Sequence, residues 1–272
     1  MPTVAGGLAS GPTYSLAAQR GIIAPADKVS QAARFFVAGA MVAFVVTAIS
    51  GRISPGATLE FFSHLRDLYS LPVDFVGRYV NLYLAIVLAN AVAAAVSAGL
   101  GTVGAAILSR LHEHDQDRDV DYGLPGRASY SVAAAWCWLG GLAAPRIRAV
   151  ADFSVRSTVA VSALAPRLSL LATGGVLGLH AAVALIERWT TGVAEFAVRI
   201  APHGLFEFPA IALSAGIGLA AADELISRAH DGPLAVRQRA LAILTSPAFR
   251  RTLGVVAALI VVGAAVEVRG LS

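Results

Sequence analysis

The stretch LFEFPAIALSAGIGLAAA at Leu205–Ala222 decides the fold of this chain. Apart from Glu207, Pro209 and Ser214, it contains only apolar residues and glycine. A helix needs about 20 such residues, with a range of roughly 17–25, to cross the hydrocarbon core of a bilayer. We therefore expect this stretch to be a membrane-spanning helix.

Five further stretches have a similar composition, with charged residues near their ends. They are Phe35–Gly51, Val80–Leu108, Ala128–Ala144, Leu168–Ile186 and Thr252–Val266. Ala128–Ala144 is borderline, because it carries Trp136, Trp138 and the pair Gly140–Gly141. The sequence therefore predicts an all-α, polytopic transmembrane helix bundle of about six spans, with a range of five to seven. With six spans, a count of Lys and Arg leans toward an external N-terminus.

The composition of the whole chain agrees with a membrane protein. Hydrophobic residues make up 57%, charged residues 14% and the mean hydropathy is +0.70, whereas soluble domains contain about 25% charged residues. These values exclude an ordinary cytosolic enzyme, a disordered chain and a disulfide-linked secreted module. The single cysteine, Cys137, excludes an internal disulfide. The 21 basic residues are spread through the connections, which does not indicate nucleic acid as a partner.

The polar connections suggest how the chain is divided. We expect residues 1–30 to form a flexible tail and residues 31–108 to hold the first helical pair. Residues 109–167 combine a polar loop with the uncertain third span, and residues 168–272 hold the C-terminal membrane helices. The segment Leu234–Leu244 has apolar residues at helical spacing with arginines between them. It is expected either to lie flat in the membrane interface or to form a soluble linker helix.

Small residues recur every four positions on three expected helices. Such faces let helix backbones approach closely in lipid, within one bundle or against a partner helix. Because the chain is rich in Ala and Gly, chance explains part of this pattern. The candidate packing residues are Ala85, Ala89, Ala93, Ser97 and Gly101 in the second span, Gly174 and Gly178 in the fourth, and Ala210, Ser214 and Gly218 in the fifth.

The most unusual polar residue is Glu207, near the start of the fifth span. His203 lies four residues earlier, on the same helix face. Pro209 removes a backbone hydrogen bond, so we expect Pro202–Ala210 to be a locally broken helix start. Three interpretations stay open: a structural pair, a polar site for a partner helix, ion or substrate, or a catalytic or metal site with His180 as a further ligand.

Two other polar features of the sequence are candidates for binding or catalysis. Asn90 in the second span is a candidate for a hydrogen bond between helices. In the loop Arg110–Arg127, Asp115, Asp117, Asp119 and Asp121 have the first spacing of a calcium loop, but Val120 stands where glycine is required. We interpret this loop as solvated and acidic. No nucleotide-binding, serine-hydrolase or zinc-protease motif is present, so the sequence predicts no catalytic residue, metal or cofactor.

The segment PHGLFEFPAIALSAGIGL at Pro202–Leu219 resembles the stage II sporulation protein M family of integral membrane proteins. That family has a Pro-His-Gly-x-x-Glu-x-x-Ala signature, which falls here on Pro202, His203, Gly204, Glu207 and Ala210. Asn90 followed by Gly99 and Gly101, and Glu267 in the ending AAVEVRG, are similar to further family features. Gly174 stands where the family usually has Asn. The resemblance covers about residues 80–108 and 168–267, and residues 109–167 look like an insertion.

The resemblance implies a non-enzymatic, multi-pass protein of the cell membrane. In endospore formers, the family member is a scaffold for peptidoglycan hydrolases. The leading hypothesis is a scaffold or assembly component of a membrane or cell-envelope complex, with the lipid bilayer, other membrane proteins or further copies of this chain as partners. The alternative is a permease subunit with a polar site at the fifth span. The third hypothesis is an intramembrane hydrolase.

Overall fold

The computed structural model describes residues 25–77, 82–115 and 124–271, and all regular elements within these residues are helices. The α-helices are α2 (Ala26–Ile53), α3 (Pro55–Gly77), α4 (Leu82–Ala95), α5 (Gly101–Asp115), α6 (Leu124–Ala143), α7 (Phe153–Arg228), α8 (Pro233–Thr245) and α9 (Pro247–Leu271). A π-helical turn, η1 (Val96–Leu100), joins α4 to α5, and two short 3₁₀ helices, η2 (Pro145–Ala149) and η3 (Ala229–Asp231), flank α7.

Five helical segments of the described chain are long and apolar enough to cross a membrane. They are Ala26–Ile53, Tyr83–Leu111, Phe153–Pro202, Gly204–Asp231 and Pro247–Glu267. This confirms the predicted all-α polytopic bundle at the lower end of the expected range. The borderline third span corresponds to α6, whose apolar part Ser131–Ala143 is shorter than a span. The helix ends there because Pro145 starts the 3₁₀ turn and two arginines follow.

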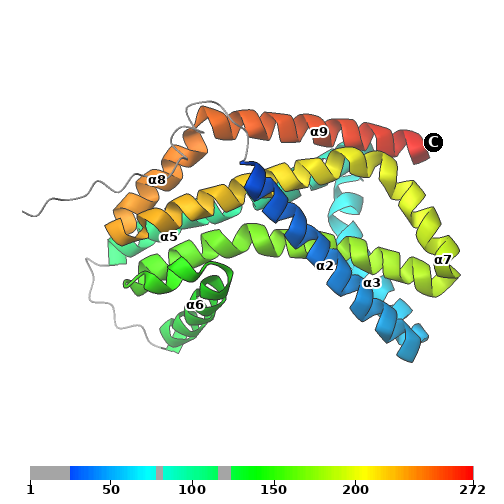
Figure 1. Cartoon of the computed structure of the whole chain (residues 1–272), viewed down its shortest axis with the longest axis horizontal. Coiled ribbons are helices and arrows are strands. Elements are labelled where there is room, and N and C mark those ends of the chain that lie inside the picture. The colour runs from blue at the N-terminus through cyan, green and yellow to red at the C-terminus, as the bar shows by residue number, and fades with distance from the viewer. Residues whose placement is uncertain (1–24, 78–81, 116–123, 272) are drawn as a thin grey trace, which may run out of the picture.

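Helix α7 is folded back on itself, so it supplies two of the five segments (Figure 1). Its backbone leaves the helical region at Arg188 and at Trp189, which has a φ of 54°. The break therefore lies where the predicted span Leu168–Ile186 ends. The first limb of α7 runs from Phe153 to the break, and the second limb ends at Arg228. In Figure 1 the ribbon turns again around residue 200, where its colour becomes yellow.

Two sequence expectations about α7 need correction. The expected break at Pro202–Ala210 takes the form of a bend rather than of non-helical backbone: Pro202 and Pro209 lie inside the helix, and the ribbon turns around residue 200, where the apolar segments Phe153–Pro202 and Gly204–Asp231 meet (Figure 1). The first limb also begins at Phe153, well before the predicted start at Leu168. The side chain of Asp152 caps that start, because its Oδ1 accepts hydrogen bonds from the N–H groups of Ser154 at 2.7 Å and Val155 at 3.2 Å.

The bundle has two distinct ends, which lie left and right in Figure 1. At the α8 end, a buried core joins α5, η2, both limbs of α7, and α8; it includes Ile147, Val150, Leu225, Val236 and Ala240. At the Trp189 end, the guanidinium of Arg52 from the end of α2 lies over the ring of Trp189, 4.6 Å from its centroid. The helix α9 runs from the α8 end toward the Trp189 end.

Glycines bring α2 and the first limb of α7 into backbone contact. A Cβ atom on Gly174 would overlap the carbonyl of Phe36, and one on Gly178 would overlap the carbonyl of Ala40. From the other side, a Cβ on Gly39 would overlap the backbone of Leu171. Only residues without a side chain allow this approach, and close backbone packing is what holds helices together in lipid. These three glycines therefore set the distance between the two helices.

We predict that Gly178→Ala lowers the thermal unfolding midpoint of the purified protein in detergent. The added methyl group meets backbone atoms that cannot move aside, and overpacking of this kind costs about 1–3 kcal/mol. Gly254→Ala on α9 is the matched control, because nothing lies within 4 Å of its Cβ position. That change should be neutral or stabilising by up to about 1 kcal/mol, since alanine favours helix. Equal midpoints for the two variants would contradict the proposed contact.

Candidate functional site

Asn90 and Glu207 meet across the contact between α4 and the second limb of α7. The side-chain amide of Asn90 donates a hydrogen bond from Nδ2 to Oε1 of Glu207, with 2.6 Å between the two atoms. Both side chains are partly buried, and 117 residues of sequence separate them. Asparagine can donate to a carboxylate or to a neutral carboxyl group, so this bond forms in either protonation state.

The helix α9 closes the third side of this site. A Cβ atom on Gly263 would lie 3.0 Å from Cγ of Glu207, so the α9 backbone passes directly beside the acid. Glu267, one helical turn further on, is an electrostatic neighbour of Glu207. We call Asn90, Glu207 and Glu267 the polar cluster. It brings one carboxamide and two carboxyl groups together from three helices.

Apolar side chains pack next to the polar cluster on the same three helices. Ala94 from α4, Ala210 from α7, and Val256 and Ile260 from α9 form a small buried core. Tyr83 adds a further link between α4 and α9, since its hydroxyl donates to the carbonyl of Val261 at 3.3 Å. Apolar surroundings lower the local dielectric, which strengthens a hydrogen bond such as that between Asn90 and Glu207.

The other residues of the predicted broken helix contribute differently. Pro209 is exposed and lies within helical backbone. The side chain of His203 lies outside the part of the chain that the structure describes, so its pairing with Glu207 stays a prediction. The hydrogen-bond partner that the structure gives Glu207 is Asn90. The sequence indicated Asn90 and Glu207 as polar groups in the membrane, but it did not predict that they form a pair.

His180, the candidate third ligand, has other neighbours. Its Nδ1 lies 2.8 Å from the carbonyl oxygen of Val176 in its own helix. Its ring packs edge-on against Phe62, with centroids 5.1 Å apart, and is stacked with Phe196 at 6.4 Å. Among the described residues, no group of three or more His, Cys, Asp and Glu side chains is placed to hold a metal ion. Asp117, Asp119 and Asp121 of the acidic loop lie outside those residues.

The predicted small-residue faces lie mainly against helices of the same chain. The hydroxyl of Ser162 donates to the carbonyl of Gly101 at 2.8 Å, and that of Ser214 donates to the carbonyl of Ala94 at 2.5 Å. The hydroxyl groups of Ser97 and Ser169 are 2.6 Å apart. Buried members of the predicted set are Ala85, Ser97, Gly101, Gly174, Gly178, Ala210, Ser214 and Gly218, whereas Ala89 and Ala93 are partly exposed.

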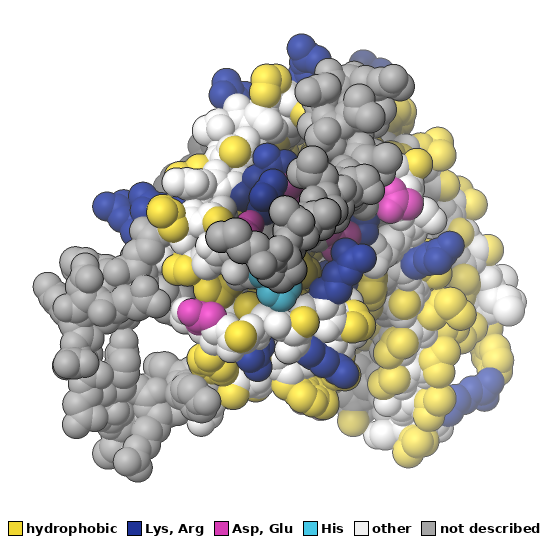
Figure 2. Space-filling model, turned by 60° about the vertical axis from the view of Figure 1, so that its left-hand side comes forward, with side chains coloured by type: hydrophobic (Ala, Val, Ile, Leu, Met, Phe, Trp, Pro, Cys, Tyr) yellow, Lys and Arg dark blue, Asp and Glu magenta, His cyan; other side chains and the backbone are white. Residues whose placement is uncertain are grey.

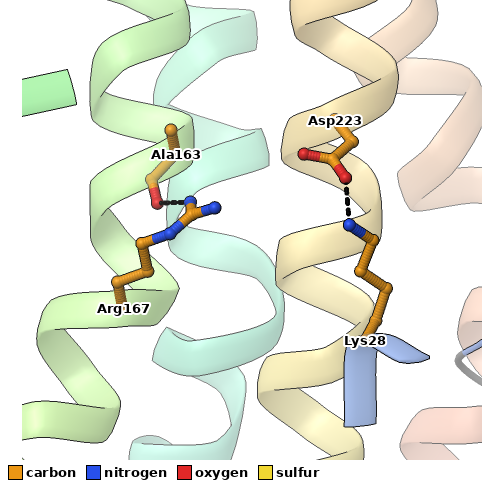
Figure 3. A network of polar contacts seen from close by, with 4 residues as sticks. All are labelled: Lys28, Ala163, Arg167 and Asp223. Carbon is orange, nitrogen blue, oxygen red and sulfur yellow. Dashed lines mark hydrogen bonds and ion pairs between the residues drawn. The ribbon is translucent and has the colours of Figure 1, made fainter. Parts of the chain in front are cut away.

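A second polar network lies nearer the α8 end, and the sequence analysis did not find it (Figure 3). Lys28 at the start of α2 forms an ion pair with Asp223 in the second limb of α7. Arg167 in the first limb is 5% exposed and donates from Nη1 to the carbonyl of Ala163. Its guanidinium also faces the ring of Phe35, 5.7 Å from the centroid. None of these charged residues was among the candidate site residues expected from the sequence.

Comparison with known proteins identifies the family but no individual relative. Neither the curated proteins nor the solved structures contain a match to this chain. The family described as stage II sporulation protein M matches residues 129–269.

This matched part covers more than half of the chain and contains Glu207 and Glu267, but not Asn90. The match begins inside α6, so it includes part of residues 109–167, which were expected to be an insertion. The division of the chain into domains stays a prediction. The chain is a helical protein of membrane type, and it belongs to the stage II sporulation protein M family.

Proposed function

We propose that this protein is a non-enzymatic scaffold or assembly component of a complex in the cell membrane or cell envelope. The observation that carries the proposal is the hydrogen bond between Asn90 and Glu207. It gives the intramembrane acid a structural partner within the bundle. The family membership supports a membrane protein of this kind.

The energetics of the polar cluster favour a structural role. An ionised carboxylate at the bilayer centre costs roughly 2.5–3.5 kcal/mol on insertion scales. A hydrogen bond between membrane helices contributes about 0.6 kcal/mol on average and about 1.7 kcal/mol at most. The bond with Asn90 therefore offsets part of the cost of burying the carboxylate. It can do so only while α4, α7 and α9 stay together. In this role Glu207 holds three helices in one arrangement.

The packing also indicates where a partner protein would bind. Gly174 and Gly178 are already in contact with α2, and Ser97 and Gly101 with α7. These faces are thus occupied by the chain's own helices. Partner contacts would use the outward-facing side chains or the two ends of the bundle, rather than the small-residue faces that the sequence analysis proposed.

A permease subunit is the second candidate, and the position of Glu267 favours it. Two carboxyl groups and a carboxamide between three helices form an oxygen-rich site of the type that binds cations or carries protons in membrane proteins. Under this alternative, the charge of Glu207 is essential. Under the scaffold proposal, its ability to accept a hydrogen bond is sufficient.

We expect Asn90→Ala and Glu207→Ala to be energetically coupled. Each change removes the same hydrogen bond, so the double variant should be more stable than additivity predicts, by about 0.6–1.7 kcal/mol. Unfolding in mixed micelles measures the four free energies of the cycle. The control cycle combines Asn90→Ala with Glu187→Ala, an exposed glutamate at the Trp189 end, and should be additive. If the free energies were additive in both cycles, the proposed structural role of the Asn90–Glu207 bond would be contradicted.

Glu207→Gln separates the two candidate functions, because glutamine keeps an acceptor oxygen for Asn90 but carries no charge. Under the scaffold proposal, crosslinking and mass spectrometry from membranes recover the same proteins with Glu207→Gln as with the native chain. Glu207→Ala should reduce this recovery. Native protein in liposomes that contain a pH-sensitive dye should conduct no more protons than empty liposomes. If the native protein supported a proton flux that Glu207→Gln abolished, the scaffold proposal would be wrong and the permease alternative would be supported.

A further inference from the structure

The two ends of the bundle carry very different numbers of basic side chains. Among the residues whose side chains the structure describes, ten lie at the α8 end: Lys28, Arg110, Arg146, Arg148, Arg156, Arg228, Arg237, Arg239, Arg250 and Arg251. Four lie at the Trp189 end, Arg52, Arg188, Arg199 and Arg269, and the remaining two, Arg34 and Arg167, lie between the ends. Figure 2 looks toward the α8 end and shows Lys and Arg side chains around that face, with hydrophobic side chains along the flank.

The fold determines which segments share each end. Lys28 pairs with Asp223, so the start of α2 lies beside the end of α7. Arg239 of α8 pairs with Glu224, with 2.9 Å between the charged atoms. The buried core at the α8 end adds η2 and α5 to the same group. The five apolar segments therefore alternate in direction, and the start of α2 and the end of α9 lie at opposite ends of the bundle.

The helix α8 has the composition of a helix at a membrane surface. Val236 and Ala240 are buried against the bundle, whereas Leu234 and Leu241 are 52% and 46% exposed. These two leucines are seven positions apart and lie on the same face of α8. With Arg237 nearby, this face combines apolar and basic side chains, which is typical of helices that lie among lipid headgroups.

We propose that the α8 end is an interaction surface for the anionic phospholipid headgroups of the cytoplasmic leaflet. Basic residues accumulate on the cytoplasmic side of membrane proteins, and that leaflet attracts basic segments electrostatically. The start of α2 is therefore inside the cell and the end of α9 is outside. This differs from the external N-terminus that the six-span count favoured, because α6 does not count as a span here. The orientation goes beyond the proposed function and does not depend on it.

Cysteine accessibility tests the orientation directly. Cys137 is buried, and Cys137→Ser gives a background without thiols. Single cysteines are then placed at the exposed positions Ser54, at the Trp189 end, and Ser227, at the α8 end. A membrane-impermeant maleimide should label Ser54→Cys in intact cells, and label Ser227→Cys only after the membrane is permeabilised. Labelling of Ser227→Cys in intact cells would overturn the orientation.

The lipid contact is tested by removing charges from one end at a time. In nanodiscs, replacing phosphatidylcholine with phosphatidylglycerol should raise the thermal unfolding midpoint of the native protein. The triple variant Arg237→Gln, Arg250→Gln, Arg251→Gln should lose most of this rise. The matched triple variant Arg52→Gln, Arg188→Gln, Arg199→Gln at the Trp189 end should keep it in full. An equal rise in both triple variants would show that the α8 end makes no special contact with anionic lipid.

Discussion

Close approach of helix backbones is the constraint on which this structure depends. Lipid is as apolar as a leucine side chain, so burying leucine between helices in a bilayer gains little. Contact area must come from backbones that touch, as α2 and the first limb of α7 do at Gly39, Gly174 and Gly178. That crossing places the end of α2 beside Trp189 and its start beside Asp223. The geometry at both ends of the bundle follows from it.

Polar groups inside the bundle add specificity to this packing. Asn90 bonds to Glu207 on one side of the second α7 limb, and Lys28 pairs with Asp223 further along it. Each interaction joins segments that are distant in sequence, and each leaves a costly unpaired group if the helices assemble differently. The small-residue contacts allow close packing, while these two pairs select one arrangement of the helices.

The sequence predicts the apolar segments well and their partners poorly. Composition alone locates the end of the first α7 limb near Ile186, because lipid tolerates few charged residues. The earlier start at Phe153 depends on the Asp152 cap and on Arg167, which finds partners inside the bundle. No periodicity links Asn90 to Glu207, so their contact emerges only from the tertiary fold. The placement of α6 likewise depends on Pro145, which ends the apolar helix early.

The boundary of the family match has a consequence for what counts as a folding unit. The match begins in α6, so α2 and α4 both lie outside it. Yet α2 covers Gly174 and Gly178, and α4 supplies the amide that binds Glu207. A protein reduced to the matched residues would leave Gly174 and Gly178 uncovered by α2 and Glu207 without the amide of Asn90. The segment recognised by homology is therefore only part of the unit that is stable in the bilayer.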